Sequence, residues 1–240
     1  MNWKVLFTLW AAGSLSLLAV FPAIAASAHA RAGSAIPLAW FFAGQYAQTV
    51  LLLGLAVWLG ARLAPAVGLG APLLEAWFSG QPVAHRLKSS LVFPAVWGLL
   101  AGTLLQLLAL LVRVNLQAGA GQAWVDRLLA SFYAGIGEEL WMRWLLVTLG
   151  MWLLAALLRV RAGAWLPAWS AWLIIAVVSL ASGFAHLRGG AAGNGPAAWF
   201  AAQTVLQGLL FGWCYWRRGL EAAMACHWTA SFVTQFLPVV

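Results

Sequence analysis

The chain has 240 residues, of which 64% are hydrophobic and only 8% are charged, and its formal net charge is +8. A soluble domain carries roughly 25% charged residues, so this composition excludes a soluble globular protein and indicates an integral membrane protein. The positive charge does not indicate nucleic-acid binding, because the basic residues are scattered among the loops instead of gathering on one face.

Seven apolar stretches approach or exceed the ~20 residues that a helix needs to cross the hydrocarbon core of a bilayer. We therefore expect an all-α, polytopic transmembrane helix bundle of about seven spans, in a single integral membrane domain over residues 1–240. The predicted spans are 5–26, 38–61, 91–112, 128–158, 166–187, 197–216 and 220–237. Pro238 is expected to end the last one, since proline cannot continue a helix.

Two of these stretches allow more than one interpretation. The first begins after Lys4 and has small residues near Ala28, as a signal peptide does, but its apolar run is longer than usual, so we expect an uncleaved anchor. The fourth is too long for one straight crossing. Either Gly135 and Gly137 bend it, or its first turns lie along the membrane interface.

The basic residues predict the orientation of the chain in the membrane. By the positive-inside rule, the loops richer in Lys and Arg are cytoplasmic, so the N-terminus is expected inside and the C-terminus outside. The predicted cytoplasmic segments contain Lys4, Arg62, Arg86, Lys88, Arg159, Arg161, Arg217 and Arg218, and the opposite ones contain Arg31, Arg113, Arg127 and Arg188.

Three charged residues interrupt the fourth apolar stretch: Glu138, Glu139 and Arg143. An ionised side chain at the bilayer centre costs at least ~2.5 to 3.5 kcal/mol on insertion scales, so charge at this depth indicates function. Glu139 and Arg143 are four residues apart and share a helix face, where they can pair. Glu138 points about 100° away, which leaves its carboxylate free for chemistry.

Two of the four histidines, His186 and His227, lie within predicted spans. A single histidine at such a position is more often a hydrogen-bonding residue between packed helices than a catalyst. Two of them in a chain that also buries a Glu-Glu-x-x-x-Arg motif favour a functional interpretation.

At this point the sequence resembles the CPBP intramembrane proteases, which include the CaaX prenyl endopeptidases and many bacterial relatives. The family pattern is Glu-Glu-x-x-x-Arg on one helix, Phe-x-x-x-His on the next and His-x-x-x-Asn or Asp on a later one. The first motif matches in full as Glu138, Glu139 and Arg143. The resemblance places the protease-like core at about residues 91–240.

The second and third motifs match in part. The second keeps His186 but has Ser182 in place of the phenylalanine, with Phe184 two residues before the histidine instead. The third keeps His227 and has Ser231 in place of Asn or Asp. The order of the three motifs and their positions on the fourth, fifth and seventh spans make the combination specific.

The resemblance implies a glutamate-dependent intramembrane endopeptidase that cleaves a membrane-anchored peptide or protein tail. In this family the residues matching Glu138 and His186 activate a water molecule for attack on the scissile carbonyl. Those matching His227 and Ser231 stabilise the oxyanion. Ser231 is shorter than an amide side chain, so its reach is less. The resemblance also implies a bacterial inner membrane, no cofactor and no nucleic-acid partner.

Other functions fit parts of the same pattern. Two histidines and a glutamate are a ligand set for zinc with an open position for water, although a His-Glu-x-x-His helix is absent. A haem protein would use His186 and His227 as axial ligands but leaves the carboxylates unexplained. A proton-coupled transporter would need an inverted repeat, and none is visible. A non-catalytic binding or immunity protein on the same scaffold would explain why Ser182 and Ser231 replace the residues of the family pattern.

The predicted spans place the candidate residues at different depths. Glu138 lies near the middle of its span, His186 near the outer end of its own, and His227 about seven residues from the inner end. The catalytic interpretation fails if they lie farther apart than two hydrogen-bond lengths plus a bridging water, roughly 6 to 7 Å, and we expect all three to converge.

Overall fold

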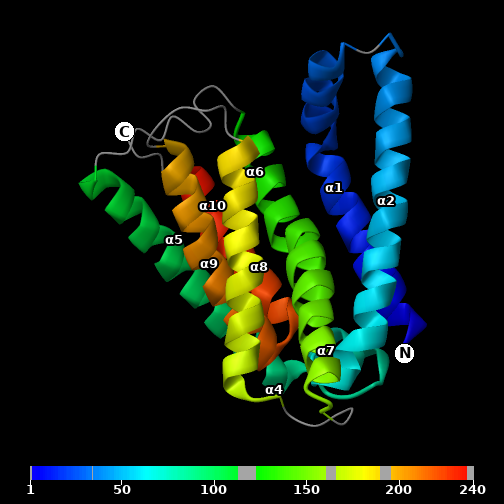
Figure 1. Ribbon diagram of the computed structural model, residues 1–240, viewed down its shortest axis with the longest axis vertical. Helices are drawn as coiled ribbons and strands as arrows, with labels where there is room; N and C mark the ends of the chain where they lie inside the picture. Colours follow the sequence, from blue (N-terminus) through cyan, green and yellow to red (C-terminus); the bar gives the residue numbers. More distant parts are fainter. Residues whose placement is uncertain (1, 34, 113–122, 161–165, 190–195, 237–240) are drawn as a thin grey trace.

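The computed structural model describes residues 2–33, 35–112, 123–160, 166–189 and 196–236, and these residues form a bundle of long helices without a strand (Figure 1). This arrangement confirms the predicted all-α bundle. The α-helices are α1 (Trp3–Ala32), α2 (Leu38–Leu63), α3 (Pro72–Phe78), α4 (Ala84–Leu87), α5 (Phe93–Leu111), α6 (Trp124–Tyr133), α7 (Thr148–Leu157), α8 (Ala168–Gly189), α9 (Pro196–Arg218) and α10 (Leu220–Phe236). Four short segments, η1 (Ala64–Val67), η2 (Lys88–Val92), η3 (Ala134–Glu138) and η4 (Leu140–Val147), connect or continue them.

Each of the seven predicted spans corresponds to a helix in the described part of the chain. Five helical runs are long and apolar enough to cross a membrane: Trp3–Pro22, Leu38–Val67, Ala84–Leu111, Trp124–Leu157 and Ala168–Leu187. The other two, α9 and α10, lie among them in the bundle. Helix α9 is less apolar than the five, and α10 is shorter, with 17 residues. The predicted stop at Pro238 lies outside the described residues.

The fourth span is one unbroken helical run from α6 through η3 and η4 to α7, which begins four residues earlier than the sequence indicated. Neither glycine breaks it. Gly135 lies against Trp228 of α10, and Gly137 lies against the Tyr133 ring and the Ser16 side chain, so both serve close packing. The segments η3 and η4 are π-helical, with wider turns than an α-helix, and such turns are frequent at functional sites.

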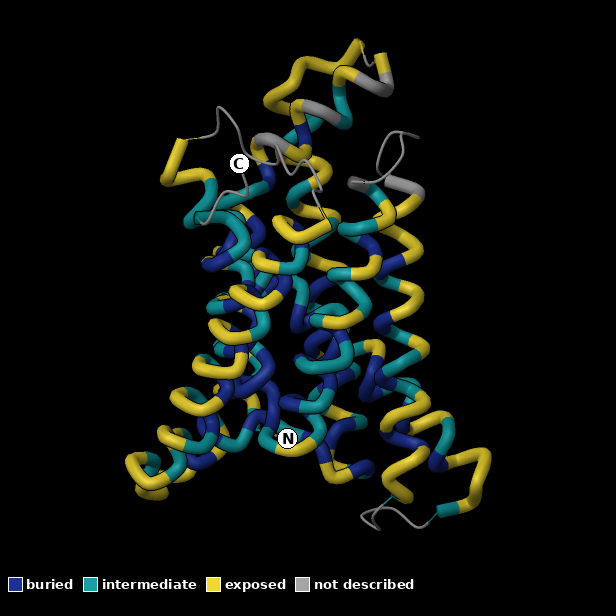
Figure 2. The backbone as a smooth tube through the Cα atoms, turned by 90° about the vertical axis from the view of Figure 1, so that its left-hand side faces the viewer, coloured by how far each residue is buried: buried dark blue, intermediate teal, exposed yellow. Residues whose placement is uncertain are grey.

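The outer faces of the helices are exposed along their length, whereas the inner faces are buried (Figure 2). Large apolar side chains dominate the exposed faces, as expected where helices contact lipid. The centre of the bundle contains the large buried side chains Leu140, Trp144, Phe211 and Tyr215. The Trp144 indole donates to the carbonyl of Val57 over 2.9 Å, which ties the fourth span to α2.

Helix α5 packs against α10 through two glycines on one face. A Cβ atom at Gly98 would collide with the carbonyl of Cys226 and the Thr229 hydroxyl, and one at Gly102 would crowd the carbonyl of Ala230. Small residues allow membrane helices to approach this closely. The contact positions α10, the helix that carries His227 on another face.

The turn between α9 and α10 lies toward the lower end of the bundle in Figure 1. The segment containing α3 supports this turn. The Leu220 amide donates to the carbonyl of Gly70 over 3.0 Å, and Glu221 Oε1 accepts from the Leu74 amide over 2.9 Å. Gly219 makes the turn with φ of 95°, in the region that favours glycine. His227 lies about two helical turns after the start of α10, so these contacts help to fix its position.

Candidate active site

A buried network joins Glu139, Arg143 and His227. Glu139 is fully buried, and its Oε1 atom accepts from Arg143 Nη1 at 3.0 Å and from His227 Nδ1 at 2.7 Å. The Glu139–Arg143 pair is the one expected from the i,i+4 spacing. Its two charges offset each other's cost of burial and also fix the histidine from the neighbouring helix.

The same network continues into α9. Arg143 Nη2 donates to the carbonyl of Gly208 over 3.1 Å, and its guanidinium carbon lies 5.4 Å from the centroid of the Phe211 ring. Phe211 in turn stacks on the His227 imidazole, with centroids 4.3 Å apart and an interplanar angle of 22°. The imidazole is therefore held at its edge by Glu139 and on one face by Phe211.

Glu138 is the carboxylate that faces the cavity. Its side chain is 38% exposed, whereas that of Glu139 is fully buried, and Glu138 Oε2 lies 3.9 Å from His227 Nε2. Since His227 Nδ1 donates to Glu139, Nε2 is the ring nitrogen that faces Glu138. Because the two glutamates are adjacent on a helix, they point in different directions: Glu139 is the buried, structural carboxylate and Glu138 is the accessible one.

His186 approaches the cavity from α8. Its Nδ1 donates to the main-chain carbonyl of Ser182 over 2.9 Å, which leaves Nε2 as the nitrogen without a main-chain bond. Within the described residues, neither ring nitrogen forms a hydrogen bond to Glu138. Because the bond at position 182 is to the main chain, the departure from phenylalanine does not affect it.

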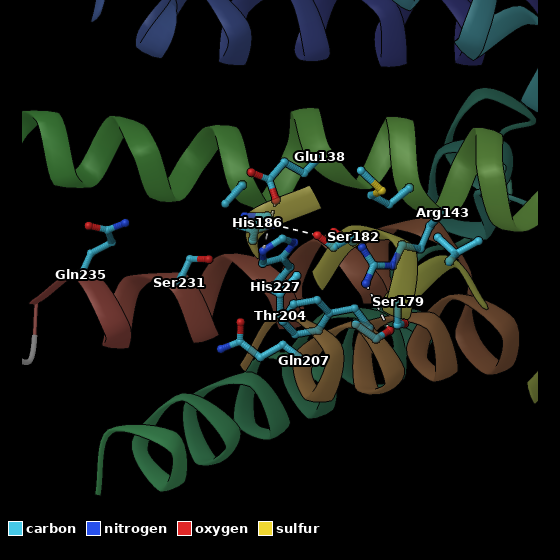
Figure 3. A pocket seen from close by; sticks show the side chains of 15 residues that line it. Glu138, Arg143, Ser179, Ser182, His186, Thr204, Gln207, His227, Ser231 and Gln235 are labelled. Carbon is cyan, nitrogen blue, oxygen red and sulfur yellow. Dashed lines mark hydrogen bonds and ion pairs between the residues drawn. The ribbon is translucent and has the colours of Figure 1, made fainter. Parts of the chain in front are cut away.

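One cavity of about 180 Å³ brings these residues together (Figure 3). Figure 3 shows Glu138 and Arg143 entering it from the fourth span, His186 from α8, Gln207 from α9, and His227 and Ser231 from α10. Its lining residues are Ala134, Glu138, Met142, Arg143, Val178, Ser179, Ser182, His186, Thr204, Gln207, Gly208, Phe211, His227, Ser231 and Gln235. Glu139 contacts the cavity through His227 and Arg143.

Sequence reasoning missed the contribution of α9. Thr204, Gln207, Gly208 and Phe211 all line the cavity, and their spacing of three, one and three residues places them on one helix face. Two polar side chains on one face of a largely apolar helix were a usable signal, because they predict a polar surface inside the bundle.

The described residues contain no group of three or more His, Cys, Asp or Glu side chains arranged to hold a metal ion. Glu138 and His227 are the cavity-facing pair nearest to that requirement, and His186 is the third ligand that the zinc alternative needs. Glu138, His186 and His227 thus all line the cavity, but they are not grouped closely enough to form a metal centre.

Comparison with known proteins gives a match to a protein family. Residues 120–233 match the family described as Type II CAAX prenyl endopeptidase Rce1-like. This segment is slightly less than half of the chain and contains all six candidate site residues, and the match confirms the resemblance drawn from the motifs. No curated protein and no solved structure matches the chain.

Proposed function

We propose that this integral membrane protein, whose residues 120–233 match the Rce1-like family, is a glutamate-dependent endopeptidase. Its substrate would be a membrane-anchored peptide or protein tail. One observation carries the proposal: Glu138 faces the cavity 3.9 Å from a histidine that a buried glutamate and arginine hold in place. A free carboxylate beside an oriented imidazole is an arrangement for activating water.

In the first step, the oxygen of a water molecule forms a bond to the carbonyl carbon of the scissile peptide. The π electrons of the carbonyl move to its oxygen, and Glu138 takes the proton that the water loses. His186, whose Nδ1 is bonded to Ser182, would orient the water through Nε2. The product of this step is a tetrahedral intermediate with a negatively charged oxygen.

In the second step, the oxyanion electrons re-form the carbonyl as the carbon–nitrogen bond breaks, and the electron pair of that bond stays on nitrogen. The proton held by Glu138 moves to that nitrogen, so the amine leaves neutral and the carboxylate is regenerated. His227 in its protonated form would donate from Nε2 to the oxyanion, because Nδ1 is already bonded to Glu139. The Ser231 hydroxyl, one turn farther along α10, would be a second donor.

The membrane determines which substrates reach this cavity. The site lies within the bundle between the fourth span, α8, α9 and α10, so a substrate would enter laterally between helices and present its chain at membrane depth. We place the protein in a bacterial inner membrane with its N-terminus in the cytoplasm, and the protease core in residues 91–240. The proposed reaction uses no cofactor.

The test is cleavage of membrane-tail reporter peptides by the purified protein in lipid vesicles. We expect Glu138→Ala and His227→Ala each to lower kcat by about 10²- to 10⁴-fold, the range for loss of a positioned acid–base group. Asp126→Ala is the matched control, because Asp126 is an exposed carboxylate on the same helical run, outside the cavity. Its activity should equal that of the wild type.

A chelator added to the same assay separates the glutamate mechanism from zinc. Unchanged wild-type activity supports the glutamate mechanism, whereas loss that zinc restores would assign the reaction to a metal held by the same residues. Absence of wild-type cleavage in native membranes would favour the binding or immunity function, since Ser182 and Ser231 already depart from the family pattern.

A further inference from the structure

A second cavity, of about 450 Å³, lies between α5, the fourth span and α10, and it shares no lining residue with the active-site cavity. We call it the apolar groove. Its lining residues are Leu91, Val92, Ala95, Phe132, Ile136, Glu221, Met224, Ala225 and Trp228. All of them except Glu221 have apolar side chains, and Glu221 is buried, with one carboxylate oxygen bonded to the Leu74 amide. The surface that the groove offers to a ligand is therefore apolar.

The groove follows one face of α10. Glu221, Met224, Ala225 and Trp228 are three, one and three residues apart, which places them on the same side of the helix over about 10 Å of rise. At the end farther from the start of α10, the Trp228 ring stacks on Phe132, with centroids 5.2 Å apart. The groove thus extends from the end of the bundle that holds the α9–α10 turn toward the middle of the membrane.

Two cations lie at the end of the groove nearer the start of α10. Lys88 comes four residues before Val92 and neighbours it on the helix surface, and its Nζ atom lies 5.5 Å from the centroid of the Phe93 ring. The Arg218 guanidinium carbon lies 5.8 Å from the same ring, and its Nη1 donates to the carbonyl of Ser89 over 3.0 Å. Within the described ranges neither cation pairs with a carboxylate. Their positive charge is therefore available to a ligand.

The chemistry of the groove selects an alkyl chain over a peptide. A peptide at membrane depth must satisfy its main-chain N–H and C=O groups, and the apolar side chains of the groove have no partners for them. An alkyl chain needs no hydrogen bond. Basic residues at the cytoplasmic membrane surface attract anionic lipid head groups, and Lys88 and Arg218 belong to the end of the bundle that the positive-inside rule assigns to the cytoplasm. An apolar chain with an anionic head matches both features.

We propose that the apolar groove binds an acyl chain of an anionic phospholipid from the cytoplasmic leaflet, with the phosphate of that lipid beside Lys88 and Arg218. The chain contacts α5, the fourth span and α10 together, so the bound lipid stabilises the packing of these three segments. The site is separate from the active-site cavity, and the inference does not depend on the proposed endopeptidase function.

The experiment follows thermal unfolding of the full-length protein in detergent as phosphatidylglycerol is added. The thermal midpoint should rise with lipid concentration, and the apparent affinity should be at least about fivefold tighter than for phosphatidylcholine with the same chains. Lys88→Gln should weaken phosphatidylglycerol binding by about fivefold. Lys4→Gln is the matched control, because Lys4 is an exposed lysine toward the same end of the bundle and outside the groove. It should leave the affinity unchanged.

A second pair of variants tests the position of the chain. Ala225→Phe places a ring in the groove and should weaken binding of phosphatidylglycerol at least about tenfold, since the acyl chain loses its apolar surface. Ala47→Phe, at an exposed position of α2 outside the groove, is its control.

If Ala225→Phe is itself less stable, the ligand is varied on the wild type instead. Dihexanoyl phosphatidylglycerol and glycerol phosphate keep the anionic group but shorten or remove the chains, and each should bind at least about tenfold more weakly than the long-chain lipid.

The outcomes that overturn the inference are specific. Equal affinities for phosphatidylglycerol and phosphatidylcholine, or equal effects of Lys88→Gln and Lys4→Gln, would exclude recognition of the head group. Unchanged binding in a stable Ala225→Phe variant would exclude the groove, and glycerol phosphate that binds as tightly as the lipid would assign the cations to a free phosphate. Displacement of the lipid by the reporter peptide would assign the groove to the substrate. A wild type that binds the lipid as described but cleaves no peptide supports this inference while the proposed function fails.

Discussion

At the scale of single residues, the two adjacent glutamates have separate tasks because a helix turns between them. Glu139 lies against Arg143 and His227 in the interior, whereas Glu138 faces the cavity. Burying the pair costs free energy of desolvation. Removing one partner destabilises the protein further, because it leaves an uncompensated buried charge. The arrangement of Glu139 and His227 therefore depends on Arg143, although no step of the proposed reaction is assigned to it.

This dependence predicts a loss of stability when the pair is broken. Arg143→Met leaves the buried Glu139 carboxylate without its cation, and we expect the free energy of unfolding to fall by about 3 to 5 kcal/mol. Denaturant titration of the purified protein in detergent measures the change. Cleavage should fall as well, because the Gly208 carbonyl and Phe211 lose the guanidinium that links them to the fourth span.

A double variant provides the control for that prediction. Glu139→Gln combined with Arg143→Met removes both charges while the glutamine still accepts a hydrogen bond from His227. Stability should recover most of the loss, whereas cleavage should stay low because the charged support of His227 is gone. A double variant as unstable as Arg143→Met would show that lost packing, not an unpaired charge, is the cause.

At the scale of elements, the position of α10 depends on its contact with α5. Gly98 leaves no room for a side chain against the main chain of Cys226, one residue before His227. Gly44 on α2, in contrast, has open space where a Cβ would lie. The two glycines therefore form a matched pair with opposite expected responses to the same substitution.

We expect Gly98→Ala to destabilise the protein by about 1 to 3 kcal/mol, the usual cost of overpacking. Gly44→Ala should be neutral or stabilise by up to about 1 kcal/mol, because alanine favours a helix over glycine. Unfolding of both variants in detergent measures the difference, and the peptide assay should show lower activity for Gly98→Ala alone. Equal stability of the two variants would contradict the close α5–α10 contact.

At the scale of the whole molecule, the two ends of the bundle differ in charge. The start of α1 and the α9–α10 turn lie toward one end of the bundle (Figure 1). The last turn of α10 lies toward the other end. Lys4, Arg62, Lys88 and Arg218 belong to the first of these ends, which the positive-inside rule assigns to the cytoplasm. Arg113 and Arg161, which the sequence count also used, lie outside the described residues.

This orientation predicts which cysteine labels from outside an intact bacterial cell. In a background with Cys214 and Cys226 changed to alanine, Ala35→Cys, at an exposed position between α1 and α2, should react with an impermeant maleimide. Ser79→Cys, exposed after α3, should react only after the membrane is permeabilised. The opposite pattern would invert the proposed orientation, and labelling of both in intact cells would contradict a membrane-spanning bundle.

Composition and motif order determined much of this protein without a structure. The apolar stretches predicted the helices because membrane-spanning segments must be both long and apolar. The Glu-Glu-x-x-x-Arg spacing predicted the Glu139–Arg143 pair and the outward position of Glu138, since both follow from helix geometry alone. The histidines were identified by type and by depth within an apolar segment.

The tertiary structure decided how those residues meet. Sequence spacing within one helix cannot show that His227 bonds to Glu139, that the start of α10 bonds to Gly70 and Leu74, or that α9 lines the cavity. These facts depend on packing between segments far apart in the chain, where a register shift of one turn would move each side chain by about 5.4 Å. The sequence by itself therefore determined which groups are available for chemistry, and packing determined which of them face one another.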